Sequence, residues 1–223
     1  MKNKFLKALV ASFALAVSGF ASAGLIVEYD YSTATSSRGL AATYVDLDFT
    51  ASALVLNNAN NTFNSFGNHF YHNGWDNVFN PNKYYSNTIG GSQTFNFNNL
   101  DFALENISGT STYWLRSSLD GFASDISSGI FGNGLVTNFS VDLSTLGDIS
   151  SPVSFRWYFA SNSIAGFANH ECGGIGTQGC GASDVGQDLK FFATVADVPE
   201  PSTLAVFALG LMGLASRKFK KKA

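Results

Sequence analysis

Apolar and polar residues alternate at a period of two over much of the chain between residues 24 and 197. Such alternation is typical of β-strands that bury one face and expose the other. In residues 153–159 the apolar side chains fall on one face, and Arg156 and Tyr158 fall on the other. The pattern recurs over residues 44–49, 94–98, 101–105, 113–115, 139–143 and 189–195.

Turns rich in Gly, Asn and Ser separate these short segments, and no segment between them carries a sustained helical stripe. The sequence therefore predicts an all-β fold, an antiparallel β-sandwich of the jelly-roll type. Helices are expected only in the two terminal segments and in one short turn at residues 119–127. Ser118 or Asp120 would cap that turn.

The N-terminal segment has the three parts of a secretory signal peptide. Lys2, Lys4 and Lys7 precede an apolar run from Ala8 to Phe20, and Ala21-Ser22-Ala23 follows it. Small residues in an A-x-A arrangement form a signal peptidase cleavage site, which makes Gly24 the expected first residue after cleavage. The chain is therefore predicted to cross the inner membrane through the Sec translocon.

The C-terminal segment also has three parts. Val198-Pro199-Glu200-Pro201 comes first, an apolar run of about 15 residues from Ser202 to Ser216 follows, and a basic tail ends the chain. Proline cannot lie inside the helix that follows, so the Pro-Glu-Pro is expected to be extended and accessible. The apolar run is shorter than the roughly 20 residues of a stable spanning helix. The basic tail is expected to stay on the cytoplasmic side.

This order of motif, apolar run and basic tail resembles the PEP-CTERM sorting signal. The resemblance implies that exosortase, a membrane-embedded cysteine protease or transpeptidase, removes the tail near the Pro-Glu-Pro. The protein would be anchored transiently in the membrane by a C-terminal transmembrane sorting helix and then reach the cell surface or extracellular matrix, in association with exopolysaccharide or biofilm. An ordinary C-terminal membrane anchor is the alternative.

Three regions follow from these signals: a signal peptide at residues 1–23, a β-sandwich domain at 24–197, and the sorting signal at 198–223. Of the 13 Lys and Arg residues, five lie between the two signals, against fifteen of the 16 Asp and Glu residues. The exported part thus has a formal charge near −10. This acidic balance excludes the basic surface that nucleic-acid binding requires.

The stretch between the two signals lacks the common sequence signatures of catalysis. The chain has no Gly-x-Ser-x-Gly, no His-Glu-x-x-His and no phosphate-binding loop. Acid pairs for glycoside hydrolysis have spatial rather than sequential spacing, so that alternative stays open. The exported domain is predicted to be non-enzymatic, with no catalytic residue.

Two cysteines, Cys172 and Cys180, lie in a Gly-rich stretch and are expected to form a disulfide in an oxidising compartment. A metal site that includes His170 and Glu171 would lack a second pair of zinc ligands. His69 and His72 are interpreted as an exposed loop pair rather than metal ligands.

No cofactor is expected. A structural Ca²⁺ is the alternative at four aspartates near predicted turns: Asp120, Asp125, Asp184 and Asp188. Turn formation explains these residues without an ion. Arg116 and Arg156 lie within predicted strands, and each is expected to pair with a carboxylate such as Asp101, Asp120 or Asp188.

The segment from Asn57 to Asn87 is unusually rich in asparagine and aromatic residues. Flat rings that stack on a pyranose, together with amide groups for its hydroxyls, are the residue types of a sugar site. Trp75, Asn77, Tyr84 and Tyr85 are the candidates, and a carbohydrate-binding module is the alternative function of the domain. The competing interpretation is an irregular excursion whose asparagines form turns.

Overall fold

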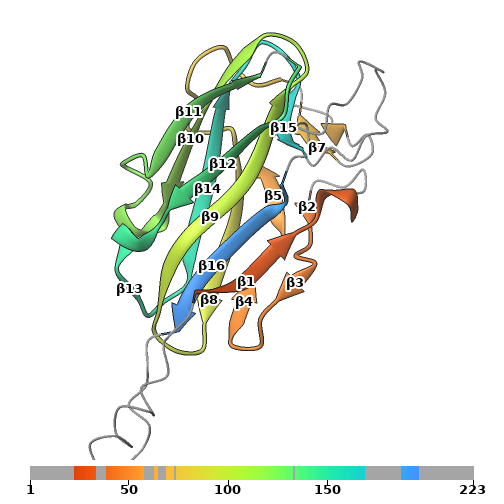
Figure 1. Cartoon of the computed structure of the whole chain (residues 1–223). Helices are drawn as coiled ribbons and strands as arrows, with labels where there is room; N and C mark the ends of the chain where they lie inside the picture. The colour runs from red at the N-terminus through yellow and green to blue at the C-terminus, as the bar shows by residue number, and fades with distance from the viewer. Residues whose placement is uncertain are drawn as a thin grey trace, which may run out of the picture. The chain divides into compact units, whose positions relative to one another are not determined.

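The alternating segments form strands in two antiparallel sheets that pack face to face (Figure 1). The computed structural model describes residues 23–33, 39–57, 63–64, 69–72, 74–132, 134–168 and 187–195, all within one unit, Ser22–Val195. Every ladder between its named strands is antiparallel. The predicted antiparallel β-sandwich is therefore confirmed.

Sheet A has the order β3-β1-β16-β9-β15-β7-β6, and β12 and β13 also pair with β9. Its strands are β1 (Gly24–Tyr29), β3 (Tyr44–Val45), β6 (Phe63–Asn64), β7 (His69–His72), β9 (Phe95–Asn106), β12 (Thr137–Asp142), β13 (Asp148–Ile149), β15 (Ala165–Ala168) and β16 (Leu189–Val195). Sheet B has the order β11-β10-β14-β8-β5-β2, and β4 also pairs with β8. Its strands are β2 (Gly39–Leu40), β4 (Phe49–Ala51), β5 (Leu54–Asn57), β8 (Tyr84–Gly91), β10 (Thr110–Ser117), β11 (Ser127–Gly132) and β14 (Val153–Ala160).

Eight of these strands follow the order of a jelly roll. β1, β16, β9 and β12 are neighbours in sheet A, because β16 and β12 pair with opposite edges of β9. β8, β14, β10 and β11 are neighbours in sheet B. The chain passes from one sheet to the other between β8 and β9, between β9 and β10, and between β11 and β12. Two such four-stranded sets make a double Greek key.

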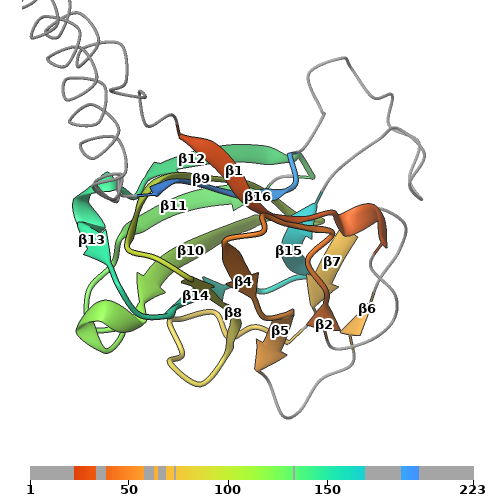
Figure 2. The ribbon, with the colours of Figure 1, turned by 90° about the horizontal axis from the view of Figure 1, so that it is seen from below.

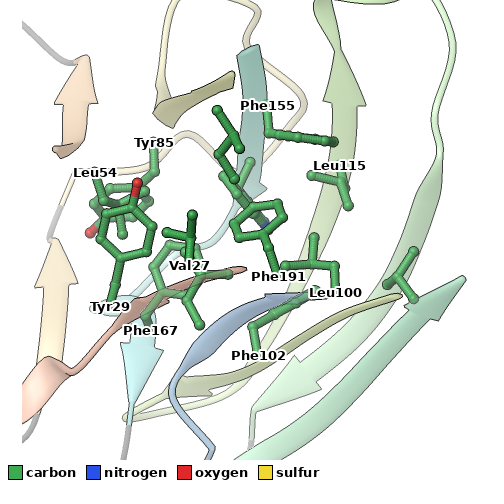
Figure 3. Close-up of a cluster of buried hydrophobic side chains, with 14 of the residues drawn as sticks. Val27, Tyr29, Leu54, Tyr85, Leu100, Phe102, Leu115, Phe155, Phe167 and Phe191 are labelled. Carbon is green, nitrogen blue, oxygen red and sulfur yellow. The ribbon is translucent and has the colours of Figure 1, made fainter. Parts of the chain in front are cut away.

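The core lies between the two sheets and is dominated by aromatic rings. Figure 3 shows Phe102, Phe167 and Phe191 of sheet A facing side chains of sheet B that include Leu115 and Phe155. All five are fully buried. Burial of each such side chain contributes about 1.5–3 kcal/mol relative to exposure. This aromatic layer fixes the spacing of the sheets and leaves the opposite face of each sheet toward solvent.

The segment at 44–49 departs from its predicted form. Instead of one strand, β3 and β4 lie in different sheets, and Leu47 between them is fully exposed. Asp46 accounts for the break: its Oδ1 accepts the backbone N–H of Asp48 at 3.1 Å, and its carbonyl oxygen accepts that of Phe49 at 3.0 Å. These two bonds close a turn, so Val45, Leu47 and Phe49 do not share a face.

The predicted helical turn at 119–127 is a single 3-10 turn, η2 (Ser118–Asp120). Two other such turns are η1 (Tyr31–Thr33) and η3 (Ser144–Leu146). Within the described ranges, none of the helices has the length and apolar character that a membrane crossing requires. The predicted signal helix and sorting helix, with Ala21 and the Val198–Pro201 motif, lie outside the described residues, as do Cys172, Cys180 and Asp184.

Candidate functional site

The outer faces of the two sheets differ in chemistry. The outer face of sheet A is polar, and its side chains bond to one another: Asn96 donates to Asp148 at 2.9 Å, Ser140 to Asp101 at 2.6 Å, and Thr194 to Asn98 at 2.9 Å. Such a face satisfies its own hydrogen bonds. The outer face of sheet B instead presents aromatic rings and cations.

We call this surface the aromatic–arginine face. It comprises Phe79, Tyr84, Trp114, Arg116, Phe122, Arg156 and Tyr158. Strand register builds it, because residues directly opposite one another project on the same side of a sheet. Trp114 on β10 lies opposite Tyr158 on β14, which lies opposite Tyr84 on β8. Two residues along, Arg116 lies opposite Arg156.

The rings of this face contact one another. The centroids of Tyr84 and Tyr158 are 5.5 Å apart, and Phe79 lies 5.1 Å from Tyr158 and 5.3 Å from Trp114. Tyr158 is only 2% exposed because Phe79 covers it. Trp114, Tyr84 and Phe79 are partly exposed. The face is therefore a surface aromatic cluster with accessible rings around a buried one.

Phe79 reaches the sheet from the loop that joins β7 to β8, residues 74–83, which Figure 2 shows beside β8 and β14 on the side away from sheet A. Lys83 fixes this loop: its Nζ donates to Asp76 Oδ1 at 2.7 Å and to the carbonyl oxygen of Gly74 at 2.8 Å. Hydrogen bonds from Lys83 and Asn80 lower the pKa of Asp76. The loop is thus a closed unit that places Phe79.

Arg116 has a structural role in this face. Its Nε donates to Asp125 Oδ1 at 2.6 Å, and its Nη1 donates to the carbonyl oxygen of Phe122 at 3.1 Å. Its guanidinium carbon lies 4.6 Å from the centre of the Phe79 ring. The predicted carboxylate partner exists, but it is Asp125 rather than Asp101, Asp120 or Asp188.

Arg156 differs from the prediction. Its guanidinium carbon lies 3.7 Å from the centre of the Phe122 ring and 4.2 Å from that of Tyr84. No carboxylate of the described residues forms an ion pair with it. Aromatic faces replace the predicted anionic partner, because a planar cation is attracted to the electron-rich face of a ring.

The position of Phe122 depends on a strained turn. Its φ of 64° is in the left-handed region, which is uncommon for a residue other than glycine. Its N–H donates to the carbonyl oxygen of Ser117 at 2.9 Å, and the Asp120 carboxylate accepts the N–H groups of Ala123 and Ser124. Hydrogen bonds, first from the Ser124 side chain, lower the pKa of Asp120. Such strain persists only where the surroundings fix it, and it clusters at functional sites.

The four predicted sugar-binding residues are not gathered in one site. Trp75 and Tyr85 are core residues: Trp75 Nε1 donates to the carbonyl oxygen of Ala165 at 3.0 Å, and the Tyr85 hydroxyl to that of Phe70 at 3.1 Å. Their faces are covered by other side chains, so neither can stack on a sugar. Tyr84 belongs to the aromatic–arginine face.

Asn77 is exposed and lies elsewhere. It lines an open hollow of about 370 Å³ together with Gly74, Trp75, Asn162, Ser163 and Ile164. The indole of Trp75 contributes to the wall of the hollow although it is 5% exposed. The hollow therefore offers amide and backbone groups but no open ring face.

The predicted metal-site alternatives have other structural roles where the structure describes them. His72 is buried in β7 with its ring 5.3 Å from that of Trp75, so it is not the exposed loop residue that was expected. Asp120 caps a turn and Asp125 pairs with Arg116. Across the described ranges, no group of three or more His, Cys, Asp or Glu residues is placed to hold a metal ion.

Comparison with known proteins gives one family match. Residues 197–221 match the family model of the PEP-CTERM protein-sorting motif. No curated protein matches the chain.

Among solved structures, a family 29 carbohydrate-binding module mutant complexed with mannohexaose has a TM-score of 0.31 and 11% identity, over 66% of this chain and 92% of that chain. Another family 29 module has a TM-score of 0.32 and 10% identity, over 66% and 89%.

Proposed function

We propose that this chain, which carries the PEP-CTERM protein-sorting motif at residues 197–221, is an exported, non-enzymatic protein of the cell surface or extracellular matrix. The motif implies export, transient anchoring in the membrane and processing by exosortase. The signal peptide ending at Ala23 supplies the route through the Sec translocon and signal peptidase. The match to the sorting motif is the observation that carries this proposal.

Replacing Pro199, Glu200 and Pro201 together by alanine tests the processing step. The variant is expected to stay in the membrane fraction with its C-terminal tail attached, because alanines would let the helix continue through the recognition site. Cell fractionation followed by intact-protein mass spectrometry measures this. Thr194→Ala, outside the matched motif, is the control and should be processed normally. Release of the triple variant at the mass of the processed protein would contradict the proposal.

A second candidate function is binding to extracellular polysaccharide, which would account for a role in biofilm. The partly exposed rings of Trp114 and Tyr84 favour it, since they lie on one face of three neighbouring strands. The flat apolar faces of aromatic side chains supply contact area at low conformational cost, and their rims hold hydrogen-bonding groups. This candidate moves the predicted sugar site from Trp75 and Tyr85 to the outer face of sheet B.

Affinity gel electrophoresis in the presence of matrix polysaccharides tests this function. The Trp114→Ala variant is expected to bind about tenfold more weakly than the natural protein, since it loses the largest partly exposed ring of the face. Thr194→Ala, on the outer face of sheet A, is the control and should bind normally. Thermal unfolding checks that both variants are folded. Absence of retardation of the natural protein by every matrix polysaccharide would eliminate this candidate.

A further inference from the structure

We propose that the aromatic–arginine face recognises an acidic polysaccharide, with Arg156 binding the carboxylate of a uronic acid residue. This inference rests on the second candidate function and names its ligand class. It depends on the aromatic rings that contact the Arg156 guanidinium, on the ion pairs of the other described cations, and on the distribution of carboxylates between the two sheets.

The Arg156 guanidinium is held in a fixed direction. Its central carbon lies over the rings of both Phe122 and Tyr84. The centroids of both rings lie within 4.2 Å of that carbon. With aromatic rings against it, the group can interact with a ligand through the N–H donors at its planar edge. That edge matches the two oxygens of a carboxylate in a bidentate pair.

The other described cations already have carboxylate partners. Lys83 pairs with Asp76 at 2.7 Å, Arg116 with Asp125 at 2.6 Å, and Lys190 with Glu28 at 3.0 Å. Among the four described Lys and Arg residues, Arg156 is therefore the one without an ion pair. A charge already paired with a carboxylate gains little from a second anion, whereas Arg156 retains its full capacity.

Carboxylates are unevenly distributed between the two sides of the sandwich. Of the twelve described Asp and Glu residues, only Asp76, Asp120 and Asp125 adjoin the aromatic–arginine face. Lys83 forms an ion pair with Asp76, Arg116 forms one with Asp125, and backbone N–H groups bond to Asp120. Seven of the other nine lie on sheet A or in the turns at its edges, and Asp46 and Asp48 lie in the turn that joins β3 to β4 of sheet B.

As far as the described carboxylates determine it, an anionic polymer meets least repulsion at the outer side of sheet B. The negative charge of the whole domain opposes such a polymer at long range. That opposition decays over about 8 Å at physiological ionic strength. Contacts within the face then decide binding, and they combine the Arg156 guanidinium with the aromatic rings next to it.

The face is large enough for more than one sugar ring. Trp114 and Tyr84 lie on β10 and β8 with β14 between them, so two strand spacings, about 10 Å, separate their backbones. Arg156 lies beside this row, over Tyr84. A chain of sugars can therefore stack on the rings while one of its carboxylates reaches the guanidinium.

Polygalacturonate and its methyl-esterified form are the matched probes, since they share a backbone and differ in the free carboxylate. The processed natural protein is expected to bind the acid form at least tenfold more tightly than the ester, measured by affinity gel electrophoresis and titration calorimetry. Arg156→Gln is expected to abolish this preference. Added salt should weaken binding of the acid form and leave binding of the ester unchanged.

Lys190→Gln is the matched control, because it removes the same charge from sheet A and should leave the preference intact. Arg156→Lys keeps the charge but loses the bidentate edge, and it too should lose most of the preference. It also provides a test if the glutamine variant does not fold.

Four outcomes would overturn the inference: equal binding of acid and ester, equal losses in Arg156→Gln and Lys190→Gln, full preference in Arg156→Lys, or equally tight binding of a sulfated polysaccharide that has no carboxylates. If acid and ester bind equally and Trp114→Ala weakens the binding of both, the domain binds carbohydrate but Arg156 does not contact a carboxylate. If the protein binds neither the acid form nor the ester and no other polysaccharide retards it, both this inference and the second candidate function are eliminated.

Discussion

Above pH 10 the domain is expected to lose about 4 kcal/mol of folding stability for each pH unit, because burial strongly raises the pKa of three of its core tyrosines, Tyr29, Tyr31 and Tyr85. Burial raises the pKa of Tyr29 from 10.0 to about 12, although a hydrogen bond from Asn87 acts in the opposite direction. Burial also raises the pKa of Tyr31 well above 10.0, as does, to a lesser degree, the charge of Asp188. The pKa of Tyr85 is raised by burial as well.

The direction of the effect follows from the unfolded state. Below pH 10 all three tyrosines are neutral in both states, and their burial carries no pH-dependent cost. Above pH 10 the unfolded chain releases three protons that the folded domain retains, and each contributes about 1.4 kcal/mol per pH unit. For Tyr29 this loss ends near pH 12. Small domains are stable by only about 5–15 kcal/mol, so unfolding is expected within this range.

Denaturant titrations at a series of alkaline pH values measure this slope, and tyrosinate absorbance reports the ionisation directly. Tyr29→Phe should reduce the slope by about one third. At neutral pH the same variant should be about 2 kcal/mol less stable, since it loses the hydroxyl bond to the carbonyl oxygen of Ser52 and the bond that Asn87 donates to the hydroxyl. A stability that stays constant between pH 10 and pH 12 would show that these hydroxyls are accessible to water.

The sequence predicts a strand reliably where one face packs on the core along its full length. Residues 153–159 are the example: Phe155 and Trp157 are fully buried, and Arg156 projects to the other face, as the alternation predicts. A one-residue slip would reverse every side chain, so burial of one face fixes the register. At residues 44–49 the same alternation is misleading, because the Asp46 turn sends β3 and β4 to different sheets.

The candidate site was only partly predictable. Alternation places Trp114, Arg156 and Tyr158 between buried neighbours on their strands, but it does not show that the two strands pair and share one outer face. The position of Phe79 could not be predicted, because it depends on the loop closed by Lys83 and on tertiary contacts. Residue type alone could not separate Tyr84, at the surface, from Tyr85, in the core. The difference arises because successive side chains of β8 point to opposite faces of sheet B.

The sorting motif is predictable for a different reason. The family model matches a short linear order of residues, 197–221, and no fold is needed to bring those residues together. A carbohydrate or carboxylate site is assembled from separate strands, and the sequence does not contain their spacing. The sequence therefore indicates the sorting motif of this protein more directly than a ligand of its domain.

Replacing Trp157 by alanine is expected to lower the free energy of unfolding by about 3–5 kcal/mol, because the largest fully buried side chain of the core would leave a cavity. Trp157 belongs to sheet B, but its ring packs against sheet A. The ring centroids lie 5.5 Å from Phe167, 6.3 Å from Phe191 and 6.4 Å from Phe102. Removal of the indole therefore weakens the contact between the two sheets.

Trp157→Phe is the matched variant for this prediction. It retains a ring at the centre of the core and removes an indole N–H that has no hydrogen-bond partner, so its loss should be clearly smaller. Urea unfolding of both variants measures the difference. Because Arg156 and Tyr158 flank this position on the same strand, the alanine variant should also weaken polysaccharide binding, whereas the phenylalanine variant should bind normally. A loss below about 1 kcal/mol for Trp157→Ala would mean that the sheets do not depend on this ring, and that the aromatic–arginine face has another support.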